Sequence, residues 1–268
     1  MGVLVRYSRM AGTFLRLGFL VSMEYRTYFF AWLVSNPLSY IFGLISLRVV
    51  VSQFQPLGGW GFEQLAFLYG MGIISHALSV IFFVQTWFMG SLVTQGEFDR
   101  MLLRPLSIPF QFCFSRLTIG CISDLIPGIV IFIYGCAAVA FQLTLSSIAS
   151  LLLALIGATL LRAGIYFITG SIAFWTKRGM TDIAFNIFDL SIRYPMSIYP
   201  KAIQFLLTFL IPVGFIAFYP ASQLLNMQTD TFLPWSLCMW TFFIGVIIYI
   251  LGMLVFKAGL KRYESAGS

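Results

Sequence analysis

The chain has 268 residues, of which 60% are hydrophobic, 18% are aromatic and only 9% are charged. Soluble domains carry about 25% charged residues, so the composition excludes a water-soluble globule and predicts an all-α integral membrane protein. The net charge of +7 does not indicate nucleic acid binding, because the basic residues lie at the ends of apolar runs rather than in one patch. Attraction to anionic lipid on the cytoplasmic leaflet explains this charge.

Residues 1–28 predict an amphipathic helix that lies on the cytoplasmic face of the membrane. Arg6, Arg9 and Arg16 are spread through an apolar stretch, and no small-residue cleavage site follows them. A cleavable signal peptide would carry its basic residues ahead of one continuous apolar core. A basic amphipathic helix instead lies in the plane of the interface.

Six apolar runs predict six transmembrane helices within a single domain that covers residues 1–268. About 20 apolar residues are needed to cross the roughly 30 Å of hydrocarbon in a bilayer. The runs cover residues 29–51, 62–93, 117–141, a fourth run that ends near 175, 202–218 and 235–256. An even number of spans places both termini on the same side of the membrane.

The basic residues orient this topology. With the N-terminus inside, fourteen of the sixteen Lys and Arg residues fall on one side of the membrane, and only Arg48 and Arg162 do not. Basic loops stay on the cytoplasmic side, so both termini are expected in the cytoplasm. The inner set consists of Arg6, Arg9, Arg16, Arg26, Arg100, Arg104, Arg116, Lys177, Arg178, Arg193, Lys201, Lys257, Lys261 and Arg262.

Residues 94–109, between the second and third runs, predict a short cytoplasmic helix parallel to the membrane. Gly96 can end the second span. Glu97 and Asp99 suit the first turn of a helix, where the helix dipole favours negative charge. Pro105 stops the helix.

The faces of this short helix have different chemistry. Phe98, Met101 and Leu102 are spaced i, i+3, i+4 and form one apolar face. Arg100 and Arg104 lie on another face. Two interpretations remain open, a docking element for a soluble partner or an interfacial helix that only anchors the loop.

Residues 179–200 are predicted to form a cytoplasmic interfacial segment, because they are too polar to span the membrane. They contain Asp182, Asp189 and Arg193, together with two Tyr-Pro pairs. We therefore expect the fifth span to begin only after them, at residue 202.

Sequence patterns for nucleotide binding and catalysis are absent. No G-x-x-x-x-G-K-[ST] occurs, so the chain is not expected to bind ATP itself. Paired carboxylates, a Ser-His-Asp set and metal-ligand clusters are also missing, which predicts no enzyme activity, no metal site and no cofactor bound by this chain. Any uphill transport would draw its energy from a partner.

Three polar residues inside the apolar runs are candidates for a substrate path, since ionisable groups within a membrane are costly and often functional. They are His76, Asp124 and Arg162. Asp124 either favours a cationic substrate or is hydrogen-bonded between helices. Arg162 either serves an anionic substrate or points to the outer interface. His76 is either a proton carrier or a hydrogen-bonded core residue.

Three motifs resemble those of a known family. The first is G-E-F-D-x-x-L-L-R-P-L at residues 96–106, and the second is F-I-A-F-Y-P-A-S-Q-L-L at residues 215–225. The third combines Phe-Trp at 174–175 with Arg-Tyr-Pro at 193–195 and Tyr-Pro at 199–200. In this order, and with six predicted spans, the chain resembles one family of type-two ATP-binding-cassette (ABC) transporter permeases over essentially its whole length.

The resemblance implies the permease subunit of an exporter in the bacterial inner membrane. Its implied partners are a dimer of cytoplasmic ABC ATPases, which would hold ATP and Mg, and a second permease in either a homodimer or a heterodimer. In such permeases the loop after the second span is a coupling helix seated on the ATPase. Carried over to this sequence, the helix would consist of Gly96, Glu97, Phe98, Asp99, Leu103, Arg104 and Pro105.

The sequence leaves more than one class of cargo possible. Amphipathic small molecules, as in drug or toxin efflux, fit Asp124 and the aromatic content of the chain. A lipid-linked glycan or a lipid is the alternative among exporters. Outside that class, the alternatives are a secondary transporter driven by an ion gradient and a non-transporting membrane scaffold or sensor.

Overall fold

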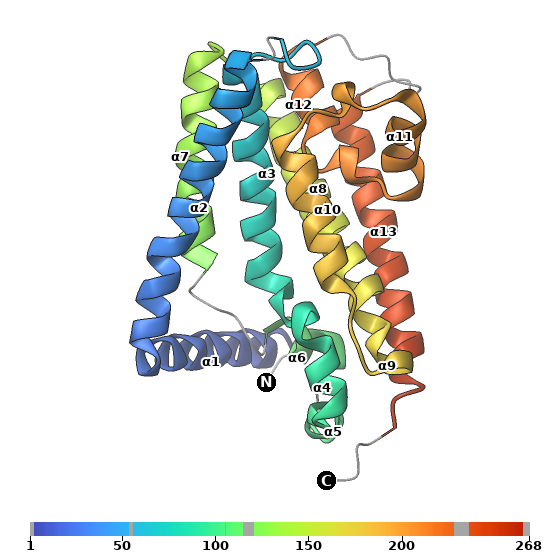
Figure 1. The fold of residues 1–268 in the computed structure, drawn as a ribbon. Coiled ribbons are helices and arrows are strands. Elements are labelled where there is room, and N and C mark those ends of the chain that lie inside the picture. Colours follow the sequence, from blue (N-terminus) through green and yellow to red (C-terminus); the bar gives the residue numbers. More distant parts are fainter. Residues whose placement is uncertain (1–2, 54–55, 105, 115–120, 228–235, 265–268) are drawn as a thin grey trace.

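The computed structural model describes residues 3–53, 56–104, 106–114, 121–227 and 236–264. These residues form helices joined by short connections, and no named β-strand occurs among them. Most of the helices stand side by side in one bundle, with α1 (Val3–Glu24) and the end of α13 (Leu237–Leu260) at its lower end in Figure 1. The predicted class, an all-α membrane protein, is confirmed.

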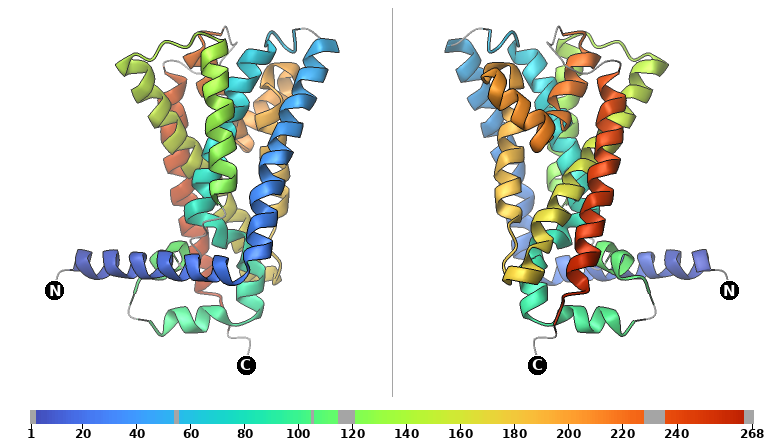
Figure 2. Two further views of the ribbon diagram at one scale, coloured as in Figure 1. Left: turned by 90° about the vertical axis from the view of Figure 1, so that its left-hand side faces the viewer. Right: turned by 90° about the vertical axis from the view of Figure 1, so that its right-hand side faces the viewer.

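The first two helices form an elbow at the lower end of the bundle. Helix α1, Val3–Glu24, lies across this end, and α2, Arg26–Gln53, then runs up the outside of the bundle (Figures 1 and 2). Pro37 lies inside α2 without ending it. This arrangement is the one expected of a helix in the membrane plane that leads into a first span.

Four helical segments among the described residues are long and apolar enough to cross a membrane. They match the first, second, fourth and sixth predicted runs, and they are Arg26–Gln53, Phe62–Thr94, Leu145–Thr176 and Leu237–Leu260. The second contains α3, Phe62–Phe83, the 3₁₀ helix η1, Val84–Phe88, and α4, Met89–Thr94. The third contains α8, Leu145–Ser171, and α9, Ala173–Thr176, and the fourth is α13.

The third predicted run corresponds to the shorter helix α7, Ile122–Ala138, of 17 residues. The predicted start of this run and Arg116 of the inner basic set lie outside the described residues. Helix α6, Ile108–Phe114, precedes the gap at the lower end of the bundle (Figure 1). Helix α7 packs against α3 at Gly135, where an added Cβ would lie 2.6 Å from the Cα of Phe67.

Helices α8 and α13 form the most extensive helix pair. Glycines recur seven residues apart on both, at Gly157 and Gly164 of α8 and at Gly245 and Gly252 of α13. A Cβ built on Gly157 would lie 2.6 Å from the backbone nitrogen of Phe242, and one built on Gly252 would lie 2.5 Å from the carbonyl oxygen of Gly164. Only glycine permits backbones to approach this closely.

Residues 179–200 differ from the interfacial segment that the sequence predicts. Most of them form α10, Thr181–Arg193, which runs up the bundle beside α8 (Figure 1). Phe188 packs on Tyr166 of α8, with ring centroids 5.2 Å apart, and an added Cβ at Gly72 of α3 would meet Ile192. The total polarity of the segment misled the prediction, because the polar residues occupy one face and the buried face is apolar.

The predicted fifth span, residues 202–218, is not one continuous helix. It is divided among α11, Lys201–Phe205, the π-helix η4, Leu206–Leu210, the 3₁₀ helix η5, Val213–Phe215, and the start of α12, Phe218–Leu224. The apolar helix at Lys201–Leu210 has ten residues and covers about 15 Å, half of what a bilayer needs. Pro212 and the Thr208 to Tyr219 hydroxyl contact of 2.6 Å fold this stretch back on itself at the upper end of the bundle (Figure 1).

Helix α10, rather than residues 202–218, therefore runs up the bundle at this point of the chain (Figure 1). As a result, two residues of the predicted inner basic set lie higher in the bundle than the sequence predicts. Arg193 lies beside Tyr69, which is seven residues, or about 10 Å, from the upper start of α3. Lys201 begins α11 after the short 3₁₀ helix η3, Met196–Ile198, at the upper end of the bundle (Figure 1).

Candidate coupling and transport sites

A six-residue helix, α5, Glu97–Leu102, hangs below the bundle between α4 and α6 (Figure 2). Gly96 begins it in the left-handed region, with φ 69°, so the chain can turn sharply where α4 ends. The Asp99 amide donates to the Gly96 carbonyl at 3.1 Å. Acidic Glu97 and Asp99 occupy its first turn, as the sequence indicates.

One side of α5 is buried in a cluster of aromatic rings, which we call the lower aromatic cluster. It consists of Phe98, Phe112, Phe174, Phe256 and Tyr263. Phe98 is completely buried, and its ring centroid lies between 5.2 and 6.2 Å from those of the other four. The cluster thus joins α5 to α6, α9, α13 and the segment after α13.

A buried glutamine holds the loop that follows α5. The Gln111 side-chain amide donates to the carbonyl of Met101 at 2.9 Å and to that of Leu106 at 3.0 Å. These two bonds bridge the predicted helix stop at Pro105, which itself lies outside the described residues. The end of α5 is therefore fixed to α6 by hydrogen bonds as well as by ring packing.

The other side of α5, together with the two residues that follow it, is exposed on the surface. Leu103 is 86% exposed and Leu102 is 52% exposed, and Arg100 and Arg104 are exposed beside them. The predicted apolar face is therefore confirmed for Phe98 and Met101 only, because Leu102 points outward. A leucine pair flanked by arginines is an apolar centre with a charged rim, the composition of a protein docking surface.

Asp99 lies on neither of these two sides. Burial, together with the neighbouring Asp99 carboxylate, raises the pKa of Tyr263 to about 12. Asp99 therefore lies beside the segment that follows α13. Its position suits holding α5 in place rather than contacting a partner.

Asp124 of α7 is 4% exposed and joins α7 to α2. Its Oδ1 accepts hydrogen bonds from Asn36 Nδ2 at 2.7 Å and from the Tyr40 hydroxyl at 2.9 Å. Asn36 Nδ2 also lies 3.1 Å from Ser123 Oγ. Of the two alternatives left open by the sequence, the structure has the carboxylate hydrogen-bonded between helices.

Arg162 is 1% exposed and lies between α8, α3 and α10, so it does not point to the outer interface. Its Nε donates to Ser75 Oγ at 3.2 Å, and its Nη2 lies 3.4 Å from the Gly72 carbonyl oxygen. Its Cζ lies 5.0 Å from the centroid of the Phe188 ring of α10. The guanidinium is thus held by hydroxyl, carbonyl and ring contacts rather than by a carboxylate.

His76 of α3 is 8% exposed and sits in a small group of rings. Its centroid lies 6.0 Å from that of Trp87 in η1 and 5.7 Å from that of Phe185 in α10. The structure therefore brings His76 and Arg162 to the region where α3, α8 and α10 meet. Asp124 lies on the other side of α3, between α2 and α7.

Helix α10 carries a set of polar residues that the sequence did not single out as site candidates. Asp182, Asn186, Asp189 and Arg193 are all partly or fully exposed. Asp189 Oδ2 and Arg193 Nε form an ion pair at 3.0 Å. The available signal was their spacing of i, i+4, i+7 and i+11, which places them on one helical face.

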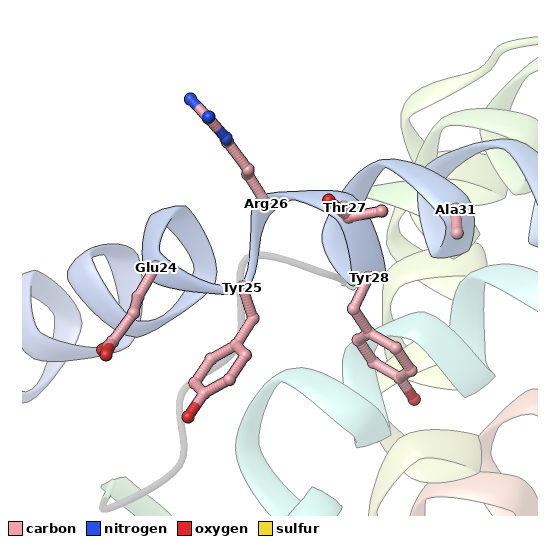
Figure 3. A pocket seen from close by; sticks show the side chains of 6 residues that line it. All are labelled: Glu24, Tyr25, Arg26, Thr27, Tyr28 and Ala31. Atoms are coloured by element: carbon pink, nitrogen blue, oxygen red, sulfur yellow. The ribbon is translucent and has the colours of Figure 1, made fainter.

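A hollow of about 530 Å³ lies at the elbow between α1 and α2. It is lined by Glu24, Tyr25, Arg26, Thr27, Tyr28 and Ala31. Figure 3 shows the Arg26 side chain pointing away from the Tyr25 and Tyr28 rings, so these groups do not converge on one ligand. No group of side chains suited to a metal ion occurs within the described ranges.

The described residues thus form an α-helical bundle with candidate membrane spans and one short helix, α5, below it. Residues 38–267 match the family described as "ABC-2 family transporter protein", so the chain belongs to that family. Membership makes it the membrane component of an ABC transporter, without a nucleotide-binding domain of its own, and implies association with an ABC ATPase. No curated protein and no solved structure shows significant similarity to the chain.

Proposed function

We propose that this protein is the permease subunit of an exporter that moves amphipathic small molecules outward across the bacterial inner membrane. A dimer of separate cytoplasmic ATPases holds and hydrolyses ATP with Mg, and docks on the exposed side of α5. The two-sided α5 carries the proposal. Phe98 and Met101 are buried in the bundle, whereas Leu103 is exposed beside Arg100 and Arg104.

The lower aromatic cluster explains how a movement of α5 reaches the bundle. Rings packed at 5 to 6 Å behave as a close-packed solid, so α5 cannot shift without displacing α6, α9 and α13. Helix α13 is in backbone contact with α8 through Gly157 and Gly245. Closure of the ATPase dimer is thereby transmitted to the α8–α13 pair as a rigid unit.

The transport step is alternating access at the interface with a second permease, either an identical or a homologous chain. Of the three predicted path residues, His76 and Arg162 lie together where α3, α8 and α10 meet, and we place them on the substrate path. Asp124 instead holds α2 on α7 and positions that interface. Amphipathic cargo suits the mixture of rings and polar groups at α10.

Substitutions on the exposed side of α5 test the proposal. In the complex with its ATPase, Leu103→Ala and Arg104→Ala should each lower ATP-driven transport about tenfold, as loss of an interface hot spot does. The melting temperature of the permease should stay unchanged, because neither side chain is buried. Arg262→Ala, an exposed arginine at the same end of the bundle but outside α5, is the matched control.

Unchanged transport in well-folded Leu103→Ala and Arg104→Ala complexes would contradict the coupling role. If the permease purifies from its native membrane without a bound ATPase, the result would favour a non-transporting scaffold or sensor. Transport that follows an ion gradient would favour a secondary transporter. ATP-driven movement of a lipid-linked glycan, with none of an amphipathic small molecule, would favour the alternative cargo.

A further inference from the structure

The outer side of α13 carries an apolar stripe that ends in two lysines, and we call it the α13 outer stripe. Its four apolar members are between 50% and 57% exposed, and both lysines are exposed as well. Their spacing keeps all six residues within an arc of about 80° on one helical face. The stripe consists of Phe243, Ile247, Ile250, Leu254, Lys257 and Lys261.

The opposite face of α13 is the one that packs against the bundle. An added Cβ at Gly245 or Gly252 would meet the backbone of α8, and one at Gly259 would meet Phe174. In the right-hand view of Figure 2, α13 (red) runs down the near side of the bundle. The described part of the chain therefore leaves the α13 outer stripe uncovered.

The apolar part of the stripe has the length of one lipid leaflet. Phe243 and Leu254 are eleven residues apart, which is about 16 Å along a helix. The hydrocarbon of a bilayer is about 30 Å thick, so one leaflet accounts for about 15 Å. Lys257 and Lys261 follow about 5 Å and 10 Å below Leu254, at the depth of the lipid headgroups.

The two lysines stay close together and are not neutralised within the chain. The Lys261 amide donates to the Lys257 carbonyl at 3.3 Å, so the helical turn continues through both. No ion pair among the described residues involves either lysine. With Arg262 and Glu264, this end of the chain carries two net positive charges. Asp99 of α5 lies on the side of the lower aromatic cluster, away from the stripe.

The charges decide what covers the stripe. A twofold axis between two identical membrane subunits stands normal to the bilayer, so the same residues meet at the same depth. Pairing along this face would bring four lysine ammonium groups together, which like-charge repulsion opposes. A soluble protein does not reach the apolar part. An anionic phospholipid fits both parts, because its acyl chain is apolar and its phosphate is negative.

We infer that the α13 outer stripe binds an anionic phospholipid, with an acyl chain along residues 243–254 and the phosphate held by Lys257 and Lys261. Side chains four residues apart on a helix are neighbours, so one phosphate contacts both ammonium groups. The site is separate from the proposed cargo and from the docking side of α5. It nevertheless adjoins the lower aromatic cluster, because Phe256 precedes Lys257 and packs on Phe98.

Photocrosslinking of lipid to the full-length permease tests this site. The protein is placed in phosphatidylcholine nanodiscs that contain a small fraction of phosphatidylglycerol with a diazirine in one acyl chain. Peptide mass mapping then locates the adducts. We expect adducts on residues 243–254 at several times the yield given by phosphatidylcholine with the same diazirine chain. Equal yields from the two lipids would overturn the preference for an anionic headgroup.

Substitution of the lysines tests where the headgroup is held. Lys257→Gln and Lys261→Gln should each lower the yield on residues 243–254 about fivefold, the effect of one basic residue near anionic lipid. Lys177→Gln, an exposed lysine after α9 at the same end of the bundle, is the matched control and should not lower it. Adducts on α2 in the same samples correct for the amount of folded protein.

An unchanged yield in both α13 variants, or an equal loss in Lys177→Gln, would show that diffuse charge rather than this stripe attracts the lipid. Both results would overturn the site. Neither depends on transport, so failure of the Leu103 and Arg104 tests leaves the lipid site unaffected, and loss of the lipid site leaves the coupling role of α5 unaffected.

Discussion

Two helix pairs in this bundle are held together by opposite means. Helices α8 and α13 meet through glycines, with backbone against backbone. Helices α2 and α7 meet through one buried carboxylate that accepts two hydrogen bonds. In a membrane the hydrophobic effect does not drive helices together, so close packing and polar bonds are the available forces.

The difference shows which part of the molecule can rearrange. Backbone contact over the length of α8 and α13 has one geometry and resists sliding. Most residues of α2 are exposed, whereas most residues of the segment Phe62–Thr94 are buried. A helix attached by a few polar bonds suits a part that shifts against its neighbours, whereas the α8–α13 pair suits a part that moves only as one rigid unit.

The largest expected effect comes from separating α8 from α13. Gly157→Leu should destabilise the protein by about 3 kcal/mol or more, because the new side chain overlaps the backbone of α13 at Phe242. Thermal unfolding in detergent measures the loss. Gly12→Leu in α1, where an added Cβ meets nothing within 4 Å, should leave the melting temperature nearly unchanged.

A smaller effect is expected from the polar attachment of α2. Asp124→Ala should cost about 1 to 2 kcal/mol, because Asn36 and Tyr40 lose their common acceptor. Asp124→Asn, which retains one acceptor oxygen, should cost less. Both are compared with the unaltered protein by thermal unfolding. Equal stability of all three proteins would mean that the polar bonds do not hold α2 in place.

The smallest effect concerns the contact of α5 with the end of the chain. The pKa of Tyr263 is raised from 10.0 to about 12, so the folded protein favours the neutral hydroxyl. The contribution of this hydroxyl to the free energy of unfolding is therefore complete below pH 10 and is lost as pH rises through 12. Comparison of tyrosinate absorbance in the unaltered protein and Tyr263→Phe should show one tyrosine that titrates near 12. A difference spectrum that titrates near pH 10 would show that Asp99 and the lower aromatic cluster do not shield this hydroxyl.

Much of the fold follows from local sequence. Long apolar runs identify α2, α3, α8 and α13 because about 20 apolar residues in succession have few stable positions other than a membrane. The two-sided character of α5 was also visible, since helical spacing alone puts Phe98 and Met101 together. Leu102 was assigned to the wrong side because local spacing does not reveal which neighbouring residue meets the bundle.

The position of residues 179–218 was decided by the tertiary structure. Their average polarity led to the prediction that residues 179–200 lie outside the bundle at its cytoplasmic end. In the structure α10 packs within the bundle, because Phe188 and Ile192 face α8 and α3. The apolar stretch that follows was expected to span, but it folds back on itself at Pro212 and the Thr208–Tyr219 contact. Average polarity does not show that the polar residues of α10 lie on one face and the apolar residues on the face that packs against the bundle.

By itself the sequence determined the class of protein, the long apolar spans and the nature of α5, because each depends on residues that are near one another in the chain. Only the tertiary structure decided what Asp124, Arg162 and Arg193 contact. Their partners lie 84 to 90 residues away for the first two, and no spacing rule relates positions so distant. A buried carboxylate with two hydrogen-bond donors and an exposed carboxylate look alike in sequence, and only the surrounding helices distinguish them.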